Sequence, residues 1–186
     1  ISHSSKNIND IYQNNAMISR EFEPLYKTLI ANYEQIRSDF PVYSKPHILI
    51  IYPNTTDTNF LSSLNSLVNW KKQKGFKVTT VSTSATGTST GSIKTYIQNL
   101  YNNINERPDY VTLIGDVSGT FGIPTYSETY ANGCPAGSGD APYSHLAGGS
   151  EDFLGDVFIG RMSISSISDF QTMVSKVLLY EKNPTI

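Results

Sequence analysis

The sequence contains few of the residues that mark several large classes of protein. It holds a single cysteine, Cys134, which excludes a disulfide framework within the chain. Only 16% of its 186 residues are charged and the formal net charge is −2, so we expect neither nucleic acid nor an acidic membrane surface as a partner. Its apolar runs are short, which excludes a transmembrane helix. What is left is a globular chain long enough to bury a core.

Uncharged polar residues and tyrosine are abundant instead, and this composition favours an exported protein. The chain begins without methionine and shows no signal peptide, so we expect a mature or excised piece of a longer product. Residues 1–45 are predicted to form a polar lead-in followed by one helix, with Pro24 in its first turn. Apolar residues recur there at intervals of three and four positions, and they are Phe22, Leu25, Leu29, Tyr33 and Ile36.

Residues 46–186 alternate between short apolar runs and amphipathic segments. The apolar runs predict four strands covered on both faces, over residues 47–52, 76–83, 110–115 and 156–163. The amphipathic segments predict helices over residues 60–75, 93–104 and 166–181, and Ser166 and Asp169 have the spacing of a capping box. This alternation predicts an α/β domain with a parallel four-stranded sheet of order 2-1-3-4 and helices on both faces.

Four aspartates are candidate ligands for a metal ion. Asp116 follows the third predicted strand, and Asp140, Asp152 and Asp156 lie between that strand and the fourth. We expect them at one end of the sheet or in the loop that crosses it, because functional groups gather beyond the carboxyl ends of parallel strands. Carboxylates near glycine carbonyls suit a hard cation such as calcium. The alternative is that these aspartates cap turns and helix ends.

The order of the same loop has two possible explanations. The loop contains few apolar residues whose burial could hold it in place, so bound calcium is one explanation. Packing of aromatic and apolar residues is the other, and the candidates are Tyr126, Tyr130, Tyr143 and Leu146.

Cys134 is a candidate nucleophile with His145 as its base. Glycine and proline surround Cys134, whereas a nucleophilic cysteine usually stands at a strand end, at a helix N-terminus or beside a cation. We therefore favour a free thiol over a catalytic pair. His3 and His47 have no assigned role.

The segment GTSTGS, residues 87–92, is a candidate phosphate-binding loop. It lacks the lysine pattern that such loops need. We expect it to begin a helix instead, with Thr90 or Ser92 as its cap.

Several blocks of sequence, in a fixed order, resemble the first half of the catalytic domain of gingipain-type cysteine peptidases, which bacteria of the Bacteroidetes group secrete. The blocks are LVNWKKQKGFKVTTVST (67–83), SIKTYIQNLYNN (92–103), YVTLIGDV (110–117) and DVFIGRMSISSISDFQTMVSKVLLYEKNP (156–184). The resemblance implies a caspase-like fold of two α/β subdomains, of which this chain is similar to the first.

The family's catalytic histidine and cysteine belong to its second subdomain, so the resemblance assigns no catalytic residue here. It implies a second catalytic subdomain as partner, peptide substrates in the complete enzyme, and a secreted or cell-surface location. It also implies structural calcium bound partly through the loop before the fourth strand, which Asp152 and Asp156 match; Asp116 and Asp140 match other acidic positions. The alternative function is a stand-alone doubly wound binding module without peptidase activity.

Overall fold

The structure, a computed structural model, describes residues 17–36, 42–129, 135–148 and 154–184. Its contacts form two compact units, Ile1–Pro46 and His47–Ile186, and each is described by itself. The division lies one residue from the boundary that the sequence predicted.

The first unit contains two short helices where the sequence predicted one. α2 spans Glu23–Leu29 and α3 spans Tyr33–Ile36. The prediction of a single helix was wrong because the chain becomes extended at Ile30. The break lets the ring of Tyr33, which is 2% exposed, fold back to 6.0 Å from the ring of Tyr26. The apolar period thus continues through a break in the helix, and Tyr33 still packs beside Tyr26.

The second unit is built on a parallel sheet. Its strands are β1 (His47–Tyr52), β2 (Lys77–Ser82), β3 (Tyr110–Ile114) and β6 (Phe158–Met162). β1 pairs with β2 and β3, and β3 pairs with β6, all in parallel, so the order is β2-β1-β3-β6. The predicted order 2-1-3-4, with β6 as the fourth strand, is confirmed.

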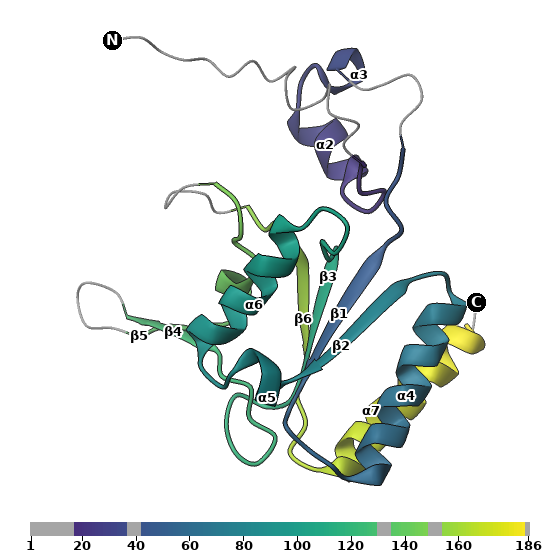
Figure 1. Cartoon of the computed structure of the whole chain (residues 1–186), viewed down its shortest axis with the longest axis vertical. Coiled ribbons are helices and arrows are strands. Elements are labelled where there is room, and N and C mark those ends of the chain that lie inside the picture. Colours follow the sequence, from purple (N-terminus) through teal and green to yellow (C-terminus); the bar gives the residue numbers. More distant parts are fainter. Residues whose placement is uncertain (1–16, 37–41, 130–134, 149–153, 185–186) are drawn as a thin grey trace. The chain divides into compact units, whose positions relative to one another are not determined.

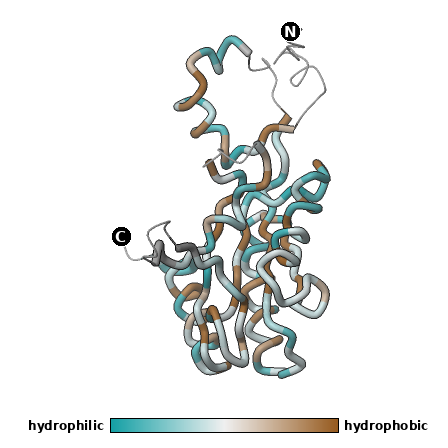
Figure 2. Tube along the Cα trace, turned by 90° about the vertical axis from the view of Figure 1, so that its left-hand side faces the viewer, coloured by the Kyte–Doolittle hydropathy of each residue, from teal (hydrophilic) through white to brown (hydrophobic). Residues whose placement is uncertain are grey.

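Helices cover both faces of this sheet (Figure 1). α4 (Thr58–Gln73) and α7 (Ile167–Lys182) share one face, and α6 (Thr90–Asn102), after the short α5 (Thr83–Thr86), lies on the other. Hydrophobic residues are concentrated along the strands between these layers, as the brown segments of Figure 2 show. Within the described part of the chain, no helix is long and apolar enough to cross a membrane.

Serine caps set the start of two of these helices. Ser166 accepts a hydrogen bond from the N–H of Asp169 ahead of α7, as their spacing predicted. α6 begins at Ser89, where Ser89 and Ser92 form a reciprocal capping box. The predicted cap, Thr90 or Ser92, was therefore misplaced, because Ser92 supplies the third helical position rather than the cap.

Glu181 ties the C-terminal ends of α4 and α7 together. Its carboxylate accepts hydrogen bonds from Lys71 at 2.6 Å, from Trp70 at 2.8 Å and from Lys74 at 2.9 Å. Burial acts to raise the pKa of Glu181, but these three bonds outweigh it and hold the pKa at about 2. The pair of helices is thus clamped at the end remote from the carboxyl edge of the sheet.

The segment between β3 and β6 is more regular than a structureless loop. β4 (Tyr126–Thr129) and β5 (Pro135–Gly139) form an antiparallel ribbon that projects away from the sheet in Figure 1, and a 3-10 turn spans Ala141–Tyr143. Ile123 and Tyr143 are fully buried. The sequence did not predict the ribbon because the residues of β5, PAGSG, have low strand propensity. Buried apolar side chains therefore anchor this segment at more positions than its polar composition had led us to expect.

We predict that the core of the sheet carries much of the stability of the second unit. Ile114 at the end of β3 is fully buried, and Ile114→Ala should lower the free energy of unfolding by about 2–5 kcal/mol. Ile104 is 48% exposed, and Ile104→Ala serves as the matched control with a change below about 0.5 kcal/mol. Urea denaturation measures both. Equal effects for the two variants would show that β3 is not a core strand.

Candidate functional site

The carboxyl ends of β3 and β6 meet at one charged side chain. Arg161 lies in β6, and its side chain is only 9% exposed. Its Nη1 donates to the carbonyl oxygens of Ile123 at 2.8 Å, Gly115 at 2.9 Å and Asp116 at 3.3 Å. All three carbonyls belong to the segment that directly follows β3. Arg161 therefore ties the edge strand to the turn beyond its neighbour.

Asp140 supplies the negative charge that faces this arginine. Nε of Arg161 donates to Oδ2 at 2.8 Å and Nη2 donates to Oδ1 at 2.7 Å, which makes a two-point ion pair. The hydroxyl of Thr125 donates a further bond to Oδ1 at 2.8 Å. Burial acts to raise the pKa of Asp140, but the bonds from Arg161 and Thr125 outweigh it and hold the pKa below its ordinary value of 3.8. Both carboxylate oxygens are thus engaged within the chain.

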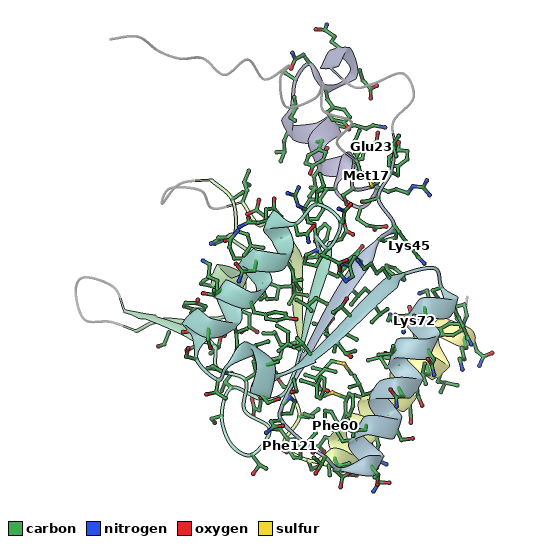
Figure 3. All side chains as sticks on the ribbon, viewed as in Figure 1. Met17, Glu23, Lys45, Phe60, Lys72 and Phe121 are labelled. Atoms are coloured by element: carbon green, nitrogen blue, oxygen red, sulfur yellow. The ribbon has the colours of Figure 1, made fainter. Side chains whose placement is uncertain are left out.

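Gly115 allows the following segment to pass close to the end of β3. Its φ is +150°, and a Cβ there would collide with the carbonyl oxygen of Phe121. The ring of Phe121 stacks on Phe60 with centroids 6.2 Å apart and planes 4° apart (Figure 3). The strand order reverses between β1 and β3, so the chain leaves these two neighbouring strands toward opposite sides of the sheet. Open α/β sheets commonly bind ligands at such a switch point. Here the two aromatic rings occupy it.

A shallow polar cavity of about 290 Å³ lies between the end of β3 and the first turns of α7. Its lining residues are Asp116, Ser163, Ile164, Ser165, Asp169, Thr172, Met173 and Lys176. Oδ1 of Asp116 accepts from the N–H of Val117, and Asp169 accepts from both the N–H and the hydroxyl of Ser165. The lining contains neither a thiol nor an imidazole, so these residues do not supply a cysteine–histidine pair.

The predicted metal ligands lie at different ends of the sheet. Asp116 and Asp140 are at the carboxyl end, whereas Asp156 stands where the segment that crosses from β3 to β6 reaches the amino end of β6. Asp156 Oδ2 accepts from two backbone N–H groups at 2.7 Å each, and Oδ1 accepts from the hydroxyl of Tyr101 at 3.2 Å. Asp152 lies outside the described residues. Among those that are described, no three His, Cys, Asp or Glu side chains are grouped to hold a metal ion.

The candidate catalytic pair cannot be placed. Cys134 and His3 lie outside the residues that the structure describes, and so does Tyr130 of the proposed aromatic packing. His145 is half-buried after the 3-10 turn. His47 is buried at the start of β1, with Nε2 2.9 Å from Oγ1 of Thr79, and burial lowers the pKa of its imidazole. Among the described residues, His47 is thus held by its contacts within the fold, and no thiol is present.

Arg161 is the central residue that the sequence reasoning missed. It stands in a run, DVFIGRMS, that was predicted to be covered on both faces. A charged side chain inside such a run needs a buried partner of opposite charge, and this was the available signal. The sequence could not show which of the four nearby aspartates is that partner.

Comparison with known proteins relates the chain to peptidases. A family model described as peptidase family C25 matches residues 42–186. Lys-gingipain of Porphyromonas gingivalis is 30% identical over 175 residues, which cover 90% of this chain and 9% of that protein. The Lys-gingipain of strain HG66 gives the same values. The chain thus spans about a tenth of the length of these relatives.

Solved structures share the fold. One titled "Structure of Protease" is 26% identical with a TM-score of 0.61, over 81% of this chain and 31% of that one. The Arg-specific cysteine proteinase gingipain R is 22% identical with a TM-score of 0.57, over 73% of this chain and 28% of that one. At that identity the second match supports the fold alone.

We predict that Asp140 stabilises the carboxyl end of the sheet. Asp140→Asn leaves a buried guanidinium without its counter-charge and should cost about 2–4 kcal/mol of unfolding free energy at pH 7. Asp116→Asn, which removes a carboxylate bonded only to a neighbouring N–H, should cost less than about 1 kcal/mol.

The pH dependence of this effect has a definite sign. Because folding lowers the pKa of Asp140, its stabilisation is present above 3.8 and is lost as the pH falls through the folded-state pKa. The gap between the wild type and Asp140→Asn should therefore shrink in acid. Chemical denaturation from pH 7 down to pH 3 measures it, and a gap that stays constant would contradict the assigned role.

Proposed function

The chain belongs to peptidase family C25, and we propose that it forms the N-terminal, non-catalytic subdomain of a secreted gingipain-like cysteine endopeptidase. The observation that carries the proposal is the closed carboxyl end of the sheet. A cysteine peptidase needs a thiol and an imidazole within hydrogen-bond reach. Among the described residues, this edge instead holds Arg161 paired with Asp140, and Phe121 packed on Phe60.

In the complete enzyme, a thiolate attacks the scissile carbonyl, a histidine passes its proton to the leaving amine, and backbone N–H groups hold the oxyanion. We assign these groups to a second subdomain. This chain contributes a rigid wall beside it, because the Arg161 network fixes the segment that follows β3. Peptides are the substrate class, and the second subdomain is the partner.

The extent of the similarity supports a part rather than a whole enzyme. The matched region makes up 31% or less of the solved chains that share the fold, and 9% of the curated relatives. A location outside the cell is likewise part of the proposal. It is supported by the polar, tyrosine-rich and charge-poor composition.

Structural calcium is a separate proposal, and the described carboxylates do not fit it by themselves. Asp140 is bonded to Arg161 through both oxygens, and Asp156 lies at the other end of the sheet. A site in this segment therefore depends on Asp152, together with backbone carbonyls, since calcium takes six to eight oxygen ligands.

We predict that the purified chain does not hydrolyse peptides after arginine, lysine or any other residue. Fluorogenic peptides under reducing conditions test this. Thiol-dependent turnover that disappears in Cys134→Ala would overturn the prediction and restore the Cys134–His145 pair. The gene product that continues beyond Ile186 should instead show thiol-dependent cleavage, and a gene that stops there favours a stand-alone module.

The calcium proposal predicts a change in melting temperature. Excess calcium should raise the melting temperature relative to a chelator, because a ligand that binds only the folded state stabilises it. The double change Asp152→Asn with Asp156→Asn should abolish the difference, while Asp169→Asn, in a helix cap, should leave it unchanged. An identical melting temperature in calcium and in chelator would refute the calcium proposal. The packing of Tyr143 and Leu146 would then be the remaining explanation for the order of the segment.

A further inference from the structure

His47 is the first residue of β1, a strand that lies between β2 and β3 (Figure 1). It is 2% exposed, and its main chain is bonded to the residue that precedes β3. The N–H of His47 donates to Oδ2 of Asp109 at 2.8 Å, and the N–H of Asp109 donates to the carbonyl of His47 at 2.9 Å. A titratable side chain is therefore buried where three neighbouring strands begin.

The imidazole of His47 joins β2 to the turn before β3. Its Nδ1 lies 3.3 Å from the carbonyl oxygen of Arg107, and its Nε2 lies 2.9 Å from Oγ1 of Thr79 in β2. A carbonyl oxygen only accepts, so Nδ1 carries the hydrogen of the neutral ring and Nε2 accepts from the hydroxyl of Thr79. In the neutral form, both ring nitrogens thus have complementary partners on two different elements.

Protonation removes this match. The added hydrogen binds Nε2, which then no longer accepts from Thr79, and the hydroxyl of Thr79 loses its acceptor. The same step places a positive charge in a site that is closed to water. Burial of a charge is unfavourable unless an opposite charge compensates for it. The contacts around His47 therefore hold the imidazolium less well than the neutral ring.

The charged side chains around His47 do not supply that compensation. Lys77 of β2 repels the imidazolium and Glu106, in the turn before β3, attracts it, but the two are paired with each other at 2.7 Å. Arg107 is engaged in a cation–π contact, and the carboxylate of Asp109 accepts from the main chain of His47. Burial lowers the pKa of His47 below its ordinary value of 6.5, and Lys77 lowers it further, against the bonds to nearby carbonyls that raise it.

We propose that His47 is an acid-sensitive latch, whose neutral ring holds the amino ends of β1, β2 and β3 together and whose protonation opens them. Histidine suits this role because its ordinary pKa of 6.5 lies within the physiological range. The inference stands on the contacts of the imidazole and does not depend on the proposed function.

The pH range of the latch follows from the sign of the shift. Because folding lowers the pKa of His47, the stabilisation is complete above pH 6.5 and is lost as the pH falls from there through the folded-state pKa. The bond from Lys77 lowers the pKa of Glu106 below 4.5, so the neighbouring ion pair stays charged down to that pH. Between pH 7.5 and 5, the change therefore belongs to His47.

Hydrogen exchange of the chain, followed by NMR, tests the latch. The amide of Asp109 should open ~10-fold more often at pH 5 than at pH 7.5, after correction for the intrinsic exchange rate, because one unit of difference in pKa between closed and open forms has this effect. Low concentrations of urea should leave that opening unchanged, since a local opening exposes little surface. An unchanged opening between the two pH values, or one at pH 5 that rises steeply with urea, would overturn the inference.

A pair of histidine variants assigns the pH dependence to its residue. In His47→Gln, which stays uncharged, the amide of Asp109 should open equally often at pH 5 and pH 7.5. His145→Gln is the matched control and should retain the ~10-fold change. If His47→Gln does not fold, His47→Phe replaces it. A pH dependence that persists in the folded His47 variant would assign it to another group and refute the latch.

The paired charges beside His47 supply a readout that a purely structural imidazole would not give. Lys77→Gln removes a repelling charge and should raise the pKa of His47, whereas Glu106→Gln removes an attracting one and should lower it. The ring proton signals of His47 report its pKa, and the pH at which the amide of Asp109 begins to open should move with it. Titration of His47 at or above 6.5 in the unaltered chain, or shifts of the same sign in both variants, would overturn the inference.

Discussion

A guanidinium group buried at the end of an edge strand shapes the carboxyl end of this sheet. Arginine has five N–H donors and no acceptor, and it stays charged, so acceptors must come from the chain when water cannot reach it. Asp140 provides two acceptor oxygens, and carbonyls of the segment after β3 provide the others. These groups are far apart in sequence. The segment between β3 and β6 must therefore fold back across the end of the sheet.

Because the segment after β3 folds back across the end of the sheet, its side chains fill the switch point between β1 and β3. The tight passage after β3 needs Gly115, and it brings Phe121 onto Phe60, whose ring also lies 4.5 Å from Phe170. Doubly wound sheets often bind a ligand at this place. In this chain side chains fill it, which agrees with the rule that a fold does not determine a function. The architecture is shared with enzymes, while this edge is occupied by packing and an internal ion pair.

The sheet and its helices were predictable because their signals are local. Strand and helix periods, and the cap at Ser166, depend on residues near in sequence. The failures have other causes: the chain becomes extended at Ile30, which breaks a helical period, and the PAGSG strand of the ribbon has low strand propensity of its own. The sequence left open which acids lie at which end of the sheet, because that depends on the path of the crossing segment. The chain runs from the carboxyl end at Asp140 to the amino end at Asp156, and no local pattern encodes that path.

The amino end of the sheet is held in a similar way. The N–H of His47 donates to Oδ2 of Asp109 at 2.8 Å, and Asp156 caps the loop before β6 while it accepts from Tyr101. Both ends of the strands are thus fixed by bonds between side chains and main chain, in addition to the core. If the chain is the non-catalytic subdomain proposed above, these bonds still bear on catalysis, since small displacements of a positioned group cost large factors in rate. They would then fix β6 beside the groups that a second subdomain supplies.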